Sequence, residues 1–114
     1  MIKPPHRELV AVFREARACL ARPHNDFAWS SWDDAATALR EVDGYLSRLE
    51  AGDLPEEEEL WLLFAGTGAI QDVAESSGWG EEFIALADRF DIASDRAYRT
   101  RLIAWLRRLA LAWR

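Results

Sequence analysis

Residues 35–52, AATALREVDGYLSRLEAG, decide the fold class of this chain. The apolar residues of the stretch recur at steps of four and three: Ala35, Leu39, Val42, Leu46 and Leu49. This spacing places them on one face of an α-helix, where they form a continuous apolar stripe. Gly52 suits the left-handed residue that ends a helix. Ser31, with Asp34 three residues later, has the form of a capping box and predicts that the helix begins near Ser31.

The same spacing predicts a helix at the start of the chain. An extended Pro4–Pro5 lead-in precedes its apolar positions, which are Leu9, Phe13, Ala16 and Leu20. Proline disfavours helical geometry in the residue before it, so Pro23 predicts that the helix ends near Arg22. The segment that follows, residues 24–30, is then a loop rich in aromatic side chains.

Pro55 and the acidic run Glu56–Glu59 predict the start of a third helix. Proline suits a first helical position, and carboxylates are stabilised by the positive end of the helix dipole. The helix continues through Leu60–Phe64, which is apolar on all sides. We therefore expect it to be buried, with Trp61 and Phe64 in the core.

Glycines divide the next part of the chain into shorter elements. Thr67 is expected to cap a short helix that ends at Gly78, with Trp79 packed over Ala74. A further helix starts at Gly80, with inward positions at Phe83, Leu86, Ala87 and Phe90. Ser94 and Asp95 predict the start of a last helix, with an apolar stripe at Tyr98, Leu102, Trp105 or Leu106, Leu109 and Trp113.

No segment alternates polar and apolar residues in the manner of a strand. The sequence therefore predicts an all-α protein, a single compact and irregular bundle of five to six helices that takes up residues 1–114 as one domain. The last helix is expected to pack on the first two, with its arginines offsetting the acidic middle of the chain. An oligomer seam and an interfacial membrane helix of the Arg/Trp type are the alternatives.

Charge is strongly segregated within a net charge of −6. Residues 49–88 contain eleven acidic residues and no basic ones, whereas residues 89–114 contain seven basic and two acidic residues. The acidic third opposes contact with nucleic acid, since each phosphate contact requires a cation. Cys19 is the single cysteine, which excludes an intramolecular disulfide. Neither a signal peptide nor a membrane-spanning run is recognisable, so we expect a cytoplasmic protein.

These features favour a small acidic protein-binding module, including an inhibitor of the immunity or antitoxin kind, that engages a basic partner. The predicted partner-binding residues are four carboxylates and two loop aromatics: Glu56, Glu57, Glu81, Glu82, Phe27 and Trp29. Trp29 is singled out because an aromatic ring beside Phe27 in a loop is a typical interface anchor. The alternative is a peripheral membrane protein held by the Arg/Trp-rich last helix.

Catalysis is a distant third reading. It would use His24 and Asp26 in the aromatic loop, with Ser30 or Ser31 as a nucleophile, but N-capping is the simpler role for both serines. Gly66–Gly68 lacks the lysine and the glycine spacing of a phosphate loop. Consecutive carboxylates point around a helix and do not converge on one ion. We therefore predict no enzyme activity, no metal and no cofactor.

Two phrases resemble those of short bacterial proteins for which no activity is established. The first is DFAWSSW at residues 26–32, and the second combines LFAGTG at residues 63–68 with GWGEEF at residues 78–83. The likeness extends over residues 26–91. It implies a compact bacterial domain and brings no catalytic residue with it.

Overall fold

The computed structural model describes residues 4–66 and 68–112, and all its regular elements are helices. They are α1 (Pro4–Leu20), α2 (Ala35–Glu50), α3 (Glu57–Phe64), α4 (Ala69–Ser77) and α5 (Gly80–Ala112). The all-α prediction is confirmed. The sixth of the five to six predicted helices required a break at Ser94–Asp95. This break is wrong, because the two helices expected after Gly80 are the single helix α5.

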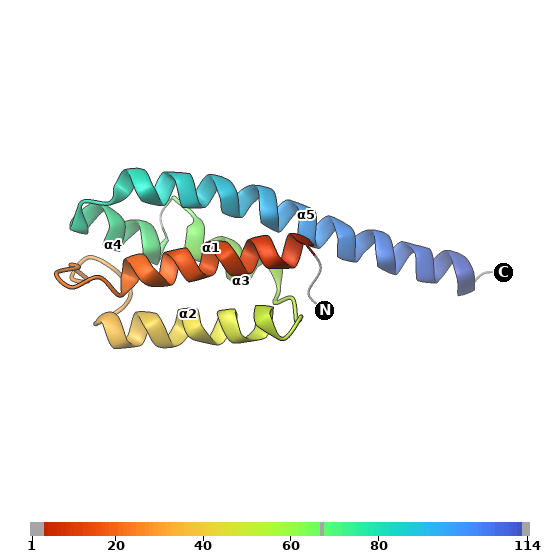
Figure 1. Ribbon diagram of the computed structural model, residues 1–114, viewed down its shortest axis with the longest axis horizontal. Coiled ribbons are helices and arrows are strands. Elements are labelled where there is room, and N and C mark those ends of the chain that lie inside the picture. Colours follow the sequence, from red (N-terminus) through yellow and green to blue (C-terminus); the bar gives the residue numbers. More distant parts are fainter. Residues whose placement is uncertain (1–3, 67, 113–114) are drawn as a thin grey trace.

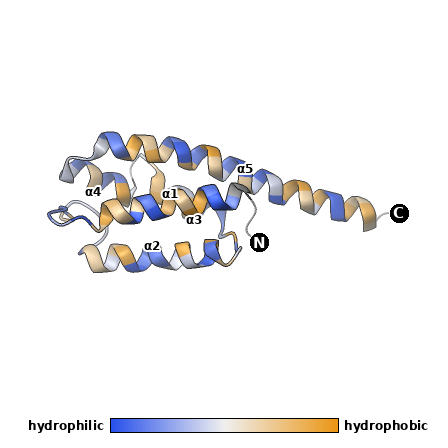
Figure 2. Ribbon diagram, in the orientation of Figure 1, coloured by the Kyte–Doolittle hydropathy of each residue, from blue (hydrophilic) through white to orange (hydrophobic). Residues whose placement is uncertain are grey.

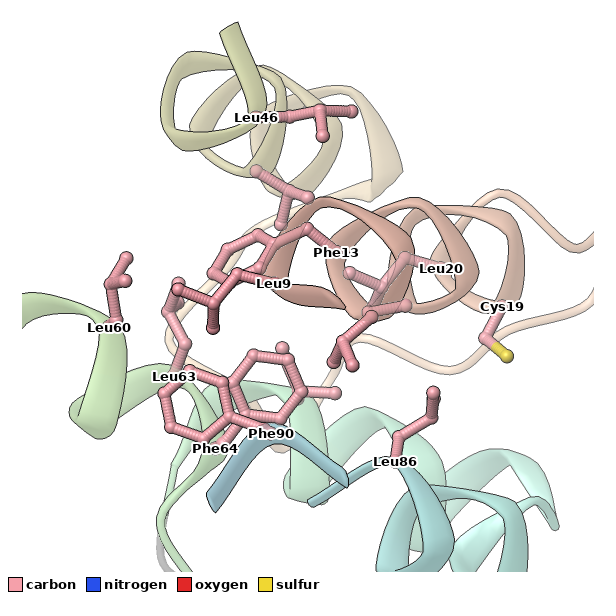
Figure 3. Close-up of a cluster of buried hydrophobic side chains, with 14 of the residues drawn as sticks. Leu9, Phe13, Cys19, Leu20, Leu46, Leu60, Leu63, Phe64, Leu86 and Phe90 are labelled. Carbon is pink, nitrogen blue, oxygen red and sulfur yellow. The ribbon is translucent and has the colours of Figure 1, made fainter. Parts of the chain in front are cut away.

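Helix α1 lies at the centre of the bundle and contacts both α2 and α5, while α3 and α4 pack against α5 (Figure 1). The core side chains come from every helix. The close-up shows those of α1, α2, α3 and α5, among them Leu9, Leu46, Leu60 and Leu86 (Figure 3). Phe64 of α3 stacks on Phe90 of α5, with ring centroids 4.3 Å apart. This aromatic contact joins the short third helix to the long fifth one.

The expected compact outline is also wrong. The molecule extends 59 Å along one axis and only 22 and 21 Å along the others, because the C-terminal part of α5 projects beyond the other helices (Figure 1). Residues 81–112 contain neither glycine nor proline, so no residue in this range breaks the helix. Asp95, expected to help start a new helix, pairs instead with Arg99 one turn later, at 2.7 Å.

Several helix ends differ from those expected. Helix α2 begins at Ala35 rather than near Ser31, because Asp34 is its N-cap and accepts a hydrogen bond from the Thr37 backbone N–H. Pro4, expected in an extended lead-in, is the first residue of α1. Helix α3 begins at Glu57 and has Glu56 as its N-cap, so Pro55 lies before the helix rather than in its first turn. The Pro55 side chain is fully buried.

Two glycine-terminated ends are confirmed. Gly52 after α2 and Gly78 after α4 both have positive φ, at 84° and 86°. The Trp79 backbone N–H donates to the Ala74 carbonyl oxygen at 2.9 Å, which is the hydrogen bond of a Schellman motif. The cap expected at Thr67 lies outside the described residues.

Helix α3 is buried on one face only. Leu60, Leu63 and Phe64 are in the core, whereas Trp61 and Leu62 are 55% and 60% exposed. The prediction is therefore confirmed for Phe64 and wrong for Trp61. Among the described helices α3 packs only against α4 and α5, so its other face remains exposed.

Candidate interaction surface

The projecting part of α5, residues 99–112, is the largest departure from the expected structure, and we call it the α5 extension. Figure 2 shows hydrophobic stretches continuing along it after the body of the bundle has ended. Its large apolar side chains are between 39% and 67% exposed: Leu102, Ile103, Trp105, Leu106, Leu109 and Leu111. The expectation that this stripe packs on α1 and α2 is therefore wrong for the described residues.

The exposed stripe continues from the edge of the buried face of the same helix. Phe83, Leu86 and Phe90 pack into the core, and so does Tyr98, one turn before Leu102. Leu102 and Trp105 follow Tyr98 at steps of four and three residues, which at 3.6 residues per turn keeps them within about 40° of it. The stripe is exposed because no residue of the described helix beyond Tyr98 is buried against the body.

Tyr98 fixes the point at which α5 leaves the body. Its hydroxyl donates to the Pro55 carbonyl oxygen, and desolvation by burial raises the pKa of this phenol to about 12. Arg101 lies over the Tyr98 ring at 5.1 Å and donates to the Leu54 carbonyl oxygen at 3.4 Å. These contacts attach the root of the extension to the segment between α2 and α3.

A groove of about 770 Å³ lies at this root. It is lined by residues of α3 and α5: Glu57, Asp95, Tyr98, Arg99, Arg101, Leu102, Trp105 and Arg108. The groove therefore combines the apolar side chains of Leu102 and Trp105 and the Tyr98 ring with two carboxylates and three arginines.

The four predicted carboxylates do not form one patch. Glu57 lines the groove at the root, and Glu56 precedes it as the N-cap of α3. Glu81 and Glu82 lie in the first turn of α5. Glu82 is separated from Asp95 in the groove by thirteen residues of α5, or about 20 Å. The sequence could not show this, since it does not place α3 along α5.

Glu82 is also engaged within the fold. Its carboxylate pairs with Arg22 at 2.6 Å, and this hydrogen bond lowers the pKa of Glu82. The other ion pairs of the acidic third use arginines of α1 and α2: Glu50 with Arg14, and Asp53 and Glu59 with Arg48. Within the described ranges, no ion pair joins this acidic third to an arginine of the α5 extension, so the expected neutralisation by the last helix is not made through such pairs.

The two predicted loop aromatics differ in their surroundings. Phe27 packs against the core, whereas Trp29 is 79% exposed and is the most exposed large hydrophobic residue of the described chain. The loop is held by Asn25, whose side chain donates to the carbonyl oxygens of Cys19 and Leu20 and accepts from the Trp79 indole N–H. Trp29 therefore projects from a well-anchored loop.

The hydrogen bonds of the candidate catalytic residues Asp26 and Ser30 hold the conformation of the loop. Asp26 accepts a hydrogen bond from the Ala28 backbone N–H at 2.9 Å, and His24 is an exposed residue with a φ of 75°. Ser30 bonds Phe27 and Trp32 within the loop, so the expectation that it caps a helix is wrong. No group of three or more potential metal ligands occurs among the residues described.

Comparison of the chain with protein-family models, with curated proteins and with solved structures finds no match. The helices described here include none with the length and apolar character needed to cross a bilayer. The α5 extension and the groove at its root are therefore the features from which we infer a function.

Proposed function

We propose that this chain is a protein-binding module whose contact surface is the α5 extension together with the groove at its root. One observation carries the proposal: six large apolar side chains between Leu102 and Leu111 are at least 39% exposed on a helix that leaves the body of the fold. Contiguous apolar surface of this kind is uncommon on soluble monomers and marks sites of interaction.

The residue types of the extension support protein contact. Tryptophan and arginine are the side chains most enriched where truncation weakens protein interfaces. Trp105 lies at the middle of the stripe, and Arg101 and Arg108 line the groove beside it. A partner that covers this face removes apolar surface from water, which is the main favourable contribution to association.

The charges of the groove favour different groups of a partner on its two sides. Glu57 and its neighbour Glu56 favour basic groups at the α3 side, whereas the arginines of the α5 side favour acidic groups. An inhibitor of the immunity or antitoxin kind is one form that such a module takes. Glu81, Glu82 and Trp29 then belong to a separate part of the surface.

The test compares two pairs of substitutions on α5. Leu102→Ser with Trp105→Ser removes the centre of the exposed stripe, and Ile84→Ser with Ile92→Ser is the matched control. The control residues are 61% and 56% exposed on the part of α5 that packs in the body. In affinity capture from the native host, the wild type and the control variant are both expected to recover a defined protein, which is either another chain or an untagged copy of this one. If the extension variant recovers the same protein in the same amount, the proposal is contradicted.

A peripheral membrane protein is the second candidate. It is favoured by the combination of exposed Trp105 with arginines on a half-apolar helix, which is typical of helices that lie in the lipid interface. Flotation with vesicles that contain anionic lipid separates the two candidates. If the wild-type chain floats, the Leu102→Ser and Trp105→Ser variant does not, and capture recovers no protein, the membrane reading replaces the protein-binding one.

A further inference from the structure

We propose that the partner of the α5 extension is a segment of another protein that lies along the groove, with apolar side chains against Leu102 and Trp105 and a carboxylate against Arg108. This inference rests on the protein-binding function proposed above and specifies the chemistry of the partner. Three features carry it: the single sign of charge on the extension, the ion pairs already made in the groove, and the position of Glu57 on its other side.

The described part of α5 beyond Asp95 carries positive charge only. All twenty acidic residues of the chain lie at or before Asp95. The arginines of the described helix beyond it are Arg96, Arg99, Arg101, Arg107 and Arg108. Apolar surface flanked by cations is complemented by apolar surface that carries acidic groups. A second α5 extension has no carboxylate to offer, so its charge does not suit it as the partner.

The contacts already made in the groove leave Arg108 open to a partner. Asp95 is paired with Arg99 at 2.7 Å, so these two charges offset each other. Arg101 lies over an aromatic ring and donates to a backbone carbonyl oxygen of the segment before α3. Arg108 is exposed, and no ion pair within residues 4–66 and 68–112 uses it. A carboxylate of a partner therefore binds Arg108 without breaking an ion pair of the fold.

Arg108 stands beside the apolar side chains of the groove. Leu102 and Trp105 line the groove with it, and both are 54% exposed. Arg108 follows Trp105 by three residues, a spacing that makes two side chains neighbours on the surface of a helix. Arginine often binds a carboxylate through two parallel hydrogen bonds, which fixes position as well as adding affinity. The groove thus offers one segment both an apolar contact and a charge that orients it.

Glu57 favours a protein segment over a lipid surface. The groove lies between the first turn of α3 and α5, and its lining residues on α5 run from Asp95 to Arg108, which is about 20 Å of helix. A protein segment of this length can carry a basic group opposite Glu57 and a carboxylate opposite Arg108. A layer of anionic headgroups has one sign of charge only, so Glu57 would repel it.

Two synthetic amphipathic peptides test the inference on the purified chain. Both carry leucine along one face of a helix. The mixed peptide has glutamate in one half and lysine in the other, and the lysine peptide has lysine in both. Fluorescence anisotropy of the labelled peptides at physiological ionic strength measures their affinity. We expect the wild type to bind the mixed peptide, and Arg108→Glu to weaken this binding about tenfold, because like charges then face each other.

Arg107→Glu is the matched control, since it changes the net charge by the same amount. Arg107 follows Trp105 by two residues, a rotation of about 200°, and does not line the groove. This variant should bind the mixed peptide as the wild type does. The lysine peptide should bind more tightly to Arg108→Glu than to Arg107→Glu, and attraction by the acidic body does not account for that difference because the two net charges are equal. Circular dichroism at 222 nm checks that both variants keep their helices.

Several results overturn the inference. One is a wild type that does not bind the mixed peptide, and another is an equal loss of binding in the two arginine variants. Flotation of the wild type with anionic vesicles that both variants lose equally makes lipid the occupant. A concentration-dependent dimer in sedimentation equilibrium, abolished by Trp105→Ser, makes a second copy the occupant.

The failure of this inference is distinguishable from that of the proposed function. A host protein whose capture is lost with Leu102→Ser and Trp105→Ser but retained with Arg108→Glu overturns the pairing of a carboxylate with Arg108 and leaves the binding function. Equal capture by the wild type and by both of these variants overturns the inference and the proposed function together.

Discussion

Two substitutions on α3 measure how the helix is packed. Phe64 is 6% exposed and stacks on Phe90 at 4.3 Å, whereas Trp61, on the same helix, is 55% exposed. Truncation of a buried aromatic to alanine typically costs about 3 to 5 kcal/mol, because contacts are lost and a cavity remains. For Trp61→Ala, more than half of the ring is already in water, so we expect about 1 kcal/mol or less.

These free energies predict distinct melting temperatures. An unfolding entropy of about 2.1 cal/mol/K per residue gives roughly 0.24 kcal/mol/K for this chain. Phe64→Ala should therefore lower the melting temperature by about 12 to 20 °C, and Trp61→Ala by less than about 4 °C. Circular dichroism at 222 nm during heating measures both. The two variants gain the same helix-favouring alanine, so each controls for the other. An equal loss of stability would refute the one-sided packing of α3.

Three further outcomes follow from single contacts of the fold. Asp34→Ala should lower the melting temperature through loss of the α2 cap, whereas Ser31→Ala should leave it unchanged; thermal denaturation of both distinguishes the observed cap from the expected one. Tyr98→Phe should destabilise the fold by about 1 to 2 kcal/mol in urea denaturation, since the Pro55 carbonyl oxygen loses its donor. The pKa of Tyr98 in the folded protein, about 12, lies above the ordinary value of 10.0. Its contribution to the free energy of unfolding is therefore complete below pH 10.0 and is lost as the pH rises towards 12. The decrease in the free energy of unfolding over this pH range should be smaller for Tyr98→Phe, measured by urea denaturation at each pH.

Local signals in the sequence predicted those parts of the fold that neighbouring residues determine. The stripes of α1 and α2, the glycine ends at Gly52 and Gly78, and the inward face of α4 depend on spacing and on backbone conformation alone. The start of α2 was misplaced because two overlapping capping signals, Ser31 and Asp34, compete within one turn. Local hydrogen bonds of the Ser30 hydroxyl to Phe27 and Trp32 hold this part of the chain in a loop before Asp34.

The candidate site depends on how helices far apart in the chain are arranged, which local spacing does not reveal. Ser94 and Asp95 are typical of helix starts, yet Ser94 is buried at 5% exposure inside α5. Tertiary packing thus overrides a local preference. The spacing of Tyr98, Leu102 and Leu109 did predict the apolar stripe itself. Its exposure depends on where the other helices end relative to α5, which the spacing does not show.

The body of the fold is complete without the α5 extension. The core cluster ends at Tyr98, and beyond it no residue of the described helix is buried. Folding of the body therefore does not require leucine at positions 102 and 109, and polar residues there would reduce the apolar surface in contact with water. We expect Leu102→Ser with Leu109→Ser to retain the wild-type melting temperature within about 2 °C, measured by circular dichroism in dilute solution. A large loss of stability would mean that the extension folds back onto the body, and the apolar stripe would then need no partner.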